Sequence, residues 1–498
     1  MMRNQEERRA LVLSALIAAA LLLFFSRSSP LYPANVQGEA NAFFTMGRGM
    51  LAGKVPYRDL VLGAGPVVYA LHALAALVSS TGFLGVWLIE IAAMTVTLYF
   101  AWKAANHISG MTRLSMGMAA LMSLLLVSSR AFMHGDTVEQ MVLPLQMFAL
   151  CDLLIYLDDE ERRMSSWRMA AHGFAAGCVF WMKFELMGVH LAFIAAMTID
   201  DMVRQWELKG AVCMCAEFAA GAALATAPWL VYFCMNGALL TFLRAYLGGE
   251  WINILAGMSP VQDALAGLAS GVINNPVCAL VMLSGAGFLM HRLAHRRWNA
   301  GCTAVTAAFA CTVLLVYMQG ERQLFSPMSI GVFLMLCAGP LALLMRYAWN
   351  RRRAYAALAG CGLMICAGYN CLVNINLPYI GYPGDELPQA VFAQYIEEHD
   401  GGTVFTYNIP DCGFYLALDQ IPQFRPFADS RAYYNVAMDR DDWKIVDREE
   451  PDWIISRSAN GPAGYSCVKT ADSPYDRGAN REGKIYQYYL YRRFDWPE

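Results

Sequence analysis

Apolar segments long enough to cross a membrane recur along most of the chain. A spanning helix needs about 20 mainly apolar residues. Of the 498 residues, 57% are hydrophobic and only 15% are charged, whereas soluble domains carry about 25% charged residues. The sequence therefore predicts a mainly α, polytopic membrane protein with about eleven transmembrane helices, at residues 10–26, 82–105, 114–131, 138–157, 169–183, 186–202, 211–235, 269–291, 301–318, 328–346 and 354–372.

Basic residues between these segments predict the orientation of the chain. Loops on the cytoplasmic side carry an excess of Lys and Arg. With the N-terminus in the cytoplasm, every basic cluster between spans falls on the cytoplasmic side. No small-residue cleavage site follows the first apolar run, so we expect that run to be a retained anchor. We therefore expect a multi-pass protein of the cell membrane whose carboxyl-terminal residues lie outside the cytoplasm.

Composition also limits the partners. A net charge of −3 provides no basic field for nucleic acid. Eleven of the fourteen cysteines lie in or beside apolar segments, where cysteine acts as a small hydrophobic residue. The pair Cys213 and Cys215 lacks partners at the spacing of a zinc site. A disulfide between Cys412 and Cys467 is left open, because it depends on an oxidising compartment.

The chain divides into two predicted domains. Residues 1–374 form the transmembrane domain, in which the first outer loop, 27–81, carries the site. The run at 66–78 is short and begins with proline, so we expect an interfacial helix there, and a second one at 239–255. Residues 375–498 have the composition of a small extracytoplasmic α/β domain, with a helix at 388–399 and strands at 403–408, 452–457 and 484–494.

Polar side chains predicted at the outer face are the candidates for chemistry, because such groups are costly at membrane depth. Acids that face bases there suit a reaction in which a carboxylate takes a proton from a hydroxyl and cations neutralise a departing phosphate. The candidates are Glu39, Arg48, Lys54, Arg58, Asp59, His134, Asp136, Glu139, Lys183, Glu185, Glu321 and Arg322.

Each candidate also has a simpler explanation. Glu39 is equally a solvated acid in a loop. The segment from Asp136 to Glu139 has the pattern of a helix N-terminus, where acids interact favourably with the helix dipole. Lys183 can extend to the membrane interface, and His72 on the short apolar helix fits an interface position better than a ligand position.

Four segments together resemble a known family. In the first outer loop, Glu39 is followed fourteen residues later by Gly53, then by V-P-Y-R-D-L and G-P-x-x-Y. This pattern resembles the first outer loop of GT-C glycosyltransferases of the family 39 type, the relatives of protein mannosyltransferases and bacterial aminoarabinose transferases. The positions that match are Glu39, Gly53, Pro56, Tyr57, Arg58, Asp59, Gly65, Pro66 and Tyr69. The family usually has Asp in place of Glu39, and Lys in place of Ala64.

The other three segments follow in the family's order. DTVEQMVLP (136–144) is similar to a T-E-E-x-x-x-P segment, GCVFWMKFELMG (177–188) to a W-x-K-F segment, and VFTYNIPDCGFYLAL (404–418) to part of the outer domain of a bacterial branch. The resemblance implies a membrane enzyme that moves a sugar from a polyprenyl-phosphate donor to a glycan, lipid or protein acceptor with inversion.

The resemblance also implies roles for single residues. Glu39 corresponds to the general base. Asp136, Glu139 and His134 support the acceptor or a metal ion; the family differs in its need for a divalent cation, which stays open. Arg58, Lys183 and Arg322 are candidates for the donor phosphate, and Tyr57, Asp59 and Pro66 shape the loop.

Three other functions compete with this interpretation. A transporter or flippase of lipid-linked glycans predicts charged residues inside several spans, whereas the spans carry few acids (among them Glu90, Asp152 and Glu217). A non-catalytic relative in envelope assembly is suggested by Glu39 and Ala64, which depart from the family pattern. A polymerase or ligase of envelope glycans predicts a large late loop rather than a terminal domain.

Overall fold

A computed structural model describes residues 2–158, 164–205, 208–248, 260–294, 299–317, 326–343, 364–365, 368–372, 374–407, 409–425, 427, 451–474 and 486–494. The chain forms two compact units. The first contains residues 1–25, 90–228 and 256–374, and the second contains residues 26–89, 229–255 and 375–498. The chain therefore enters the second unit three times.

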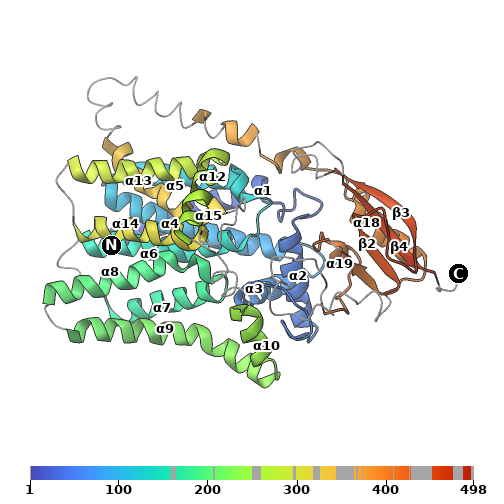
Figure 1. Cartoon of the computed structure of the whole chain (residues 1–498). Helices are drawn as coiled ribbons and strands as arrows, with labels where there is room; N and C mark the ends of the chain where they lie inside the picture. The colour runs from blue at the N-terminus through green and yellow to red at the C-terminus, as the bar shows by residue number, and fades with distance from the viewer. Residues whose placement is uncertain are drawn as a thin grey trace. The chain divides into compact units, whose positions relative to one another are not determined.

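The first unit is a bundle of helices (Figure 1). Its described α-helices are α1 (Met2–Phe25), α4 (Leu84–Ser109), α5 (Thr112–Ser128), α6 (Val138–Asp158), α7 (Ser166–Phe180), α8 (Gly188–Gln205), α9 (Leu208–Met235), α12 (Pro260–Asn274), α13 (Pro276–Ala294), α14 (Ala300–Tyr317) and α15 (Ser326–Ser329); α4 begins, and α9 ends, in the second unit. Short 3₁₀ turns are η1 (Arg130–Phe132), η2 (Phe184–Met187) and η4 (Gly331–Cys337).

Seven of the described helical segments are long and apolar enough to cross a membrane, at 5–25, 84–109, 138–156, 184–204, 208–235, 276–294 and 300–317. Shorter apolar helices lie at 66–78, 112–128, 239–248 and 331–343. The chain is thus a mainly α, multi-pass membrane protein, as the sequence predicts. The total of eleven spans stays a prediction, because most of 354–372 lies outside the described residues.

The predicted span at 269–291 is wrong in its boundaries. Instead of one helix there are two: α12 continues through Asn274 and α13 starts at Pro276. Proline fixes its own backbone angle and lacks the N–H that a continuing helix needs. The side chain of Asn275 accepts the N–H of Val277 at 3.0 Å and so caps the new helix.

Buried charges connect the helices of the first unit. The carboxylate of Asp152 on α6 receives two hydrogen bonds from Arg168 on α7, at 2.6 and 2.8 Å, and contacts the ring of His172 at 2.9 Å. At the end of α6, Asp158 binds Arg292 of α13 at 2.6 Å and Asn299 at 2.7 Å. A buried carboxylate needs such partners, since an unpaired charge is strongly destabilising there.

The second unit contains α2 (Gly38–Leu51), α3 (Pro66–Val78) and the short helix α10 (Leu239–Leu243), which continues as a π-turn, Arg244–Gly248. Helices α2 and α3 pack closely because Gly47 has no side chain: a Cβ there would lie 2.5 Å from the backbone nitrogen of Ala73. The helix predicted at 66–78 is therefore confirmed. Helix α2 was not predicted, because that stretch was interpreted as a loop punctuated by glycines.

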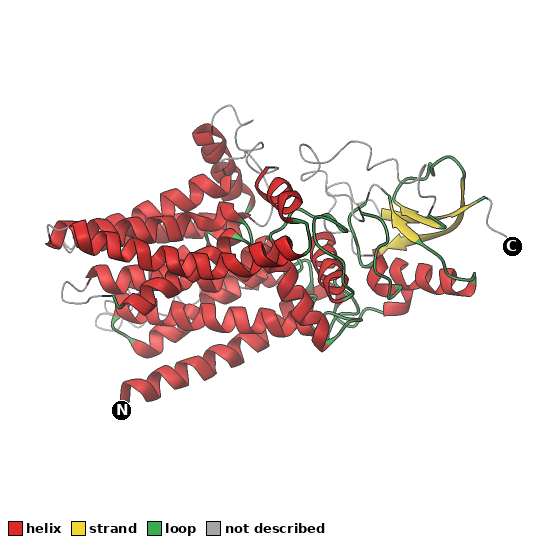
Figure 2. Ribbon diagram, turned by 90° about the horizontal axis from the view of Figure 1, so that it is seen from below, coloured by secondary structure: helices red, strands yellow, loops and turns green. Residues whose placement is uncertain are grey.

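The carboxyl-terminal residues add a sheet to the second unit (Figure 2 shows its strands in yellow). The order is β1 (Val404–Thr406), β2 (Trp453–Ser456), β4 (Tyr486–Arg493), β3 (Tyr465–Ser473); β1 and β2 are parallel and the other pairs antiparallel. Helix α18 (Pro388–Glu398) covers one face with Phe392 and Ile396, and α19 (Phe414–Ala417) follows β1.

The prediction of a small α/β fold in the tail is confirmed, including the helix and three of the four strands. Strand β3 was missed. Its sequence, YSCVKTADS, lies at the edge of the sheet and mixes polar with apolar residues, and a bulge between Cys467 and Lys469 interrupts its alternation. The division at residue 374 stays a prediction, as the second unit also includes two earlier segments.

Cys412 and Cys467 do not form a disulfide. The sulfur of Cys412 is buried beside Arg457, whose Nη2 lies 4.0 Å away, whereas Cys467 is exposed and its sulfur lies 3.7 Å from the carbonyl oxygen of Lys469. The two thiols therefore differ in access to reagents.

This difference tests the predicted orientation. In intact cells or spheroplasts, a membrane-impermeant maleimide should label the protein at Cys467, and Cys467→Ser should lower the labelling, although Cys234 is also exposed. Cys412→Ser is the matched control, because a buried thiol should contribute little. Labelling that appears only after the membrane is permeabilised would place the carboxyl-terminal residues on the cytoplasmic side.

Candidate functional site

Glu39 lies in the first turn of α2, directly after Gln37 and Gly38, and is half-buried. The partial positive charge of the helix N-terminus favours an ionised carboxylate at this position. The turn itself is fixed by Asn41, whose side-chain amide donates to the backbone oxygens of Asn35 and Gln37, both at 2.8 Å. The sequence therefore builds a rigid helix start around this acid.

Helix α2 packs against the carboxyl-terminal residues at its N-terminus. A Cβ on Gly38 would lie 2.5 Å from the Cβ of Pro410, so only glycine fits. About two turns further along, the hydroxyl of Thr45 donates to the carboxylate of Asp411 at 2.6 Å. The other oxygen of Asp411 accepts the N–H of Gly413 at 3.0 Å.

Arg48 makes the third connection at the far end of α2. Its guanidinium forms an ion pair with Asp419 and donates, at 3.4 Å, to the backbone oxygens of Tyr415 and Gln420. Burial lowers the pKa of Arg48 from its ordinary value, and the charges of Asp419 and Asp411 oppose this shift. Arg48 is thus a structural cation that joins α2 to the segment after α19.

The loop between α2 and α3 is built around Tyr57. This residue adopts a left-handed backbone conformation (φ 67°), and its hydroxyl donates to the carbonyl oxygen of Ala64 at 2.6 Å. Its buried ring packs against Tyr69, Phe233 and Phe242. The left-handed region is costly for a residue with a large side chain, so the aromatic cluster must hold it in place.

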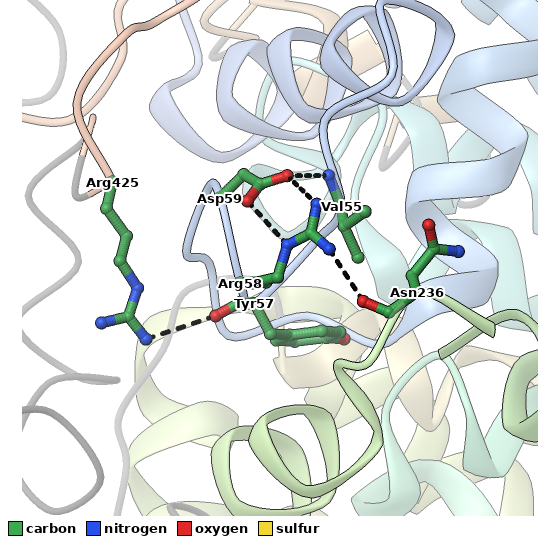
Figure 3. A network of polar contacts seen from close by, with 6 residues as sticks. All are labelled: Val55, Tyr57, Arg58, Asp59, Asn236 and Arg425. Carbon is green, nitrogen blue, oxygen red and sulfur yellow. Dashed lines mark hydrogen bonds and ion pairs between the residues drawn. The ribbon is translucent and has the colours of Figure 1, made fainter. Parts of the chain in front are cut away.

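Arg58 and Asp59 form a bidentate pair at the exposed edge of this loop (Figure 3). The Nε and Nη2 atoms of Arg58 each lie 2.8 Å from an oxygen of Asp59, and Nη1 donates to the backbone oxygen of Asn236 at 2.7 Å. Asp59 also accepts the N–H of Val55 at 2.8 Å. The hydrogen bond from Arg58 holds the pKa of Asp59 below its usual range.

This geometry gives Arg58 a structural role in addition to the one implied by the family resemblance. The guanidinium donates hydrogen bonds to Asp59 in the same loop and to the backbone oxygen of Asn236, the residue after α9. Nearby, Nη2 of Arg425 donates to the backbone oxygen of Tyr57 at 3.4 Å (Figure 3). Pro66 opens α3 at the position where a missing N–H costs nothing.

In the first unit, the predicted acids lie around the start of α6. Thr137 caps the helix, since its hydroxyl accepts the N–H of Gln140 at 3.2 Å. Asp136 is buried in a left-handed conformation (φ 56°), and its N–H donates to Glu90 and Gln140, both at 2.9 Å. The interpretation of 136–139 as a helix N-terminus is therefore confirmed. His134 lies in the preceding turn and is half-buried.

Lys183 lies between two carboxylates. Its ammonium is 3.0 Å from Glu139 on α6 and 3.6 Å from Glu185 in η2. The Glu139 side chain is only 3% exposed, whereas that of Lys183 is 21% exposed. Lys183, Glu139 and Glu185 together carry a formal charge of −1. An anionic phosphate at Lys183 would therefore have to take the place of a carboxylate, and Glu185 is the more distant of the two.

The structure brings the predicted residues together in two groups. Glu39, Tyr57, Arg58, Asp59 and Pro66 belong to the second unit; His134, Asp136, Glu139 and Lys183 belong to the first. Whether the groups converge on one substrate stays a prediction. Glu321 and Arg322 lie outside the described residues. In the part of the chain that the structure describes, no three His, Cys, Asp or Glu side chains are grouped so that they could hold a metal ion.

Two buried acids near the predicted residues were not predicted to have a role. Glu90, noted only as an acid inside a span, is fully buried and supports Asp136. Asp411 was quoted as part of a resembling segment but received no role. The sequence around Asp411, I-P-D-C-G, could have indicated a role. An acid surrounded by apolar residues, proline and glycine needs a specific hydrogen-bond partner when it is buried.

The bundle of spanning helices, the two helices of the first loop and the terminal sheet together define a membrane protein with a GT-C glycosyltransferase fold. The comparison that carries this assignment is a solved structure, ArnT from Cupriavidus metallidurans bound to undecaprenyl phosphate. The similarity has a TM-score of 0.59 and 12% identity, and covers 97% of this chain and 99% of that one.

No protein-family model matches the sequence, and no curated protein matches it either. At 12% identity the structural similarity establishes the fold alone. The fold that the resemblance implied is thereby confirmed, and the roles of the single residues stay predictions.

Asp411 gives the site a predictable dependence on pH. Burial raises the pKa of Asp411 to about 6, against the lowering effect of Thr45, Gly413 and Arg48. An acid whose pKa is raised by folding stabilises the folded state at low pH, and this contribution is lost as the pH rises through the folded value. The loss amounts to about 2 kcal/mol between pH 4 and pH 7.

Asp411→Asn should therefore weaken the pH dependence of unfolding in detergent. The melting temperature of the wild type, relative to that of the variant, should fall as the pH rises from 4 to 7. Asp385→Asn, at an exposed position, is the control and should follow the wild type. An equal pH dependence in Asp411→Asn would show that Asp411 is not buried as described.

Proposed function

We propose that the protein is an inverting glycosyltransferase that moves a sugar from a polyprenyl-phosphate donor to a hydroxyl acceptor at the outer face of the membrane. The observation that carries the proposal is the similarity of nearly the whole chain to a protein crystallised with undecaprenyl phosphate. The first loop supports it, since Glu39 begins a helix that is fixed on several sides.

In this mechanism, Glu39 is the general base. Its carboxylate takes the proton of the acceptor hydroxyl, and the oxygen attacks the anomeric carbon of the donor. The bond from that carbon to the phosphate oxygen breaks, and the lipid phosphate leaves with both bonding electrons. One displacement inverts the configuration. Glu39 extends one methylene further than the aspartate that is usual in the family, so the acceptor oxygen would lie correspondingly further from the helix.

The leaving phosphate needs positive charge. Lys183 is the best-supported candidate, because its ammonium is partly exposed. The carboxylate of Glu185 lies 3.6 Å from this ammonium, and a phosphate oxygen could bind it at a shorter distance. Arg58 is also exposed but is engaged by Asp59 and Asn236. Arg322 is proposed on its sequence position alone.

Asp136 and Glu139 were predicted to support the acceptor or a cation, and among the described residues they are not part of a group of metal ligands. Glu139 is paired with Lys183, and the backbone of Asp136 binds Glu90 and Gln140. We propose instead that Glu139 orients Lys183. The remaining features of the proposal are a cytoplasmic N-terminus, an extracytoplasmic carboxyl-terminal domain, and an acceptor that is a glycan, a lipid or a protein.

The general base is tested by Glu39→Gln in membranes supplied with a panel of labelled polyprenyl-phosphate sugars. Removal of a general base costs at least about a hundredfold in rate, so transfer should fall by that factor. Glu39→Asp should keep part of the activity, and Glu386→Gln, an exposed acid of the same unit, should keep all of it. Unchanged transfer in Glu39→Gln would remove Glu39 from the mechanism, and movement of sugar across reconstituted vesicles without bond cleavage would favour a transporter.

The phosphate site is tested by the binding of undecaprenyl phosphate itself. Lys183→Gln should weaken binding by about tenfold, the equivalent of about 1.4 kcal/mol, because it removes the cation. Glu185→Gln removes the more distant carboxylate, which a phosphate would replace, and keeps the ammonium with its closer partner Glu139, so its affinity should equal or exceed that of the wild type. If both variants weaken binding alike, Lys183 and Glu185 are a structural pair only.

A further inference from the structure

We infer that Asp411 is a positioning residue for Glu39: its hydrogen bond with Thr45 fixes the helix that carries the base, which makes the carboxyl-terminal residues part of the catalytic apparatus. The inference rests on the proposed function, because it assigns Asp411 a role through Glu39. It concerns a contact between segments of one compact unit.

The placement of Thr45 on α2 makes this coupling direct. Thr45 follows Glu39 by six residues, or about 9 Å along the helix axis. Asp411 is completely buried, and its two oxygens have separate donors, the Thr45 hydroxyl and the Gly413 N–H. A hydrogen bond is directional, so this one restricts both rotation and sliding of α2.

Two further contacts act on the same helix in a different way. Gly38 lies against Pro410 and limits how closely the helix start approaches. Arg48 binds Asp419 at the other end. The Thr45–Asp411 bond lies between them and joins two buried side chains, whereas the Asp419 partner of Arg48 is exposed. An apolar residue would fill the position of Asp411 at lower cost in desolvation, so packing alone does not explain an acid there.

Catalysis by a general base is sensitive to such positioning. A base must lie about 2.6–3.2 Å from the proton that it takes, and a displacement of about 1 Å costs about a hundredfold in rate. Because α2 is buried along most of its length, it moves as a unit, and any rotation at Thr45 is passed to Glu39.

The chain contains a matched control pair. Asp452 accepts the backbone N–H and the hydroxyl of Thr403, both at 2.8 Å. This pair has the same chemistry as Thr45 and Asp411 and connects only carboxyl-terminal residues. Its loss should weaken that part of the unit and leave α2 in place.

The experiment compares Asp411→Ala, Thr45→Val and the double variant with Asp452→Ala. The rate of transfer at saturating donor is measured with whichever labelled polyprenyl-phosphate sugar the wild type uses, together with hydrogen exchange of the α2 amides. Asp411→Ala and Thr45→Val should each lower kcat by at least tenfold and leave the KM for the donor within twofold. The double variant should be no slower than the slower single variant, since both remove one bond.

Rescue separates positioning from simple destabilisation. Asp411→Asn keeps an acceptor for the Gly413 N–H and a donor for the Thr45 oxygen, so its kcat should stay within about threefold of the wild type. Exchange of the α2 amides should be faster in Asp411→Ala and Thr45→Val, and unchanged in Asp452→Ala, whose kcat should stay within twofold.

Three results overturn the inference, and they are distinguishable. If Glu39→Gln abolishes transfer while Asp411→Ala and Thr45→Val keep their kcat, the proposed function stands and the positioning role fails. If Glu39→Gln itself leaves transfer unchanged, the proposed base fails and the positioning role fails with it. Equal losses in Asp452→Ala would also overturn the inference, because a general weakening of the unit would then explain the effect.

Discussion

The hydrogen bond between Thr45 and Asp411 joins residues 366 positions apart and connects the first loop with the end of the chain. The helix that begins with Glu39 depends on this kind of contact. Alone, a fourteen-residue helix with three glycines would be marginal in water. Packing against α3 and against Pro410 supplies the stability that its own sequence lacks.

The same requirement explains the pairing of charges throughout the described structure. A carboxylate away from water is stable only with hydrogen-bond donors or a cation. Asp152 has Arg168 and His172, and Glu139 has Lys183. Two of the predicted donor-phosphate ligands, Arg58 and Lys183, are therefore already paired with carboxylates. An anionic substrate that binds at either cation would replace a carboxylate, and the carboxylates orient the cation before the substrate arrives.

Much of the fold was predictable, because the signals are local. Apolar runs of about 20 residues predict spanning helices, and proline at position 66 marks a helix start; the same signal at Pro276 was overlooked. The predictions failed where local sequence and tertiary context disagree. Helix α2 was taken for a loop because its glycines are normally helix breakers, yet Gly38 and Gly47 serve close packing. Strand β3 was missed because edge strands need little apolar surface.

The sequence by itself determined that this chain is a membrane protein with a charged first loop and a polar terminal domain, since hydropathy and the placement of Pro and Gly are properties of neighbouring residues. The GT-C fold was implied by a resemblance of motifs and was established by the structural similarity. Only the tertiary structure decided which polar groups meet. It paired Arg48 with Asp419, Lys183 with Glu139 and Thr45 with Asp411. Such pairs form between segments far apart in the chain, and a side chain's partner is fixed by packing rather than by its position in the sequence.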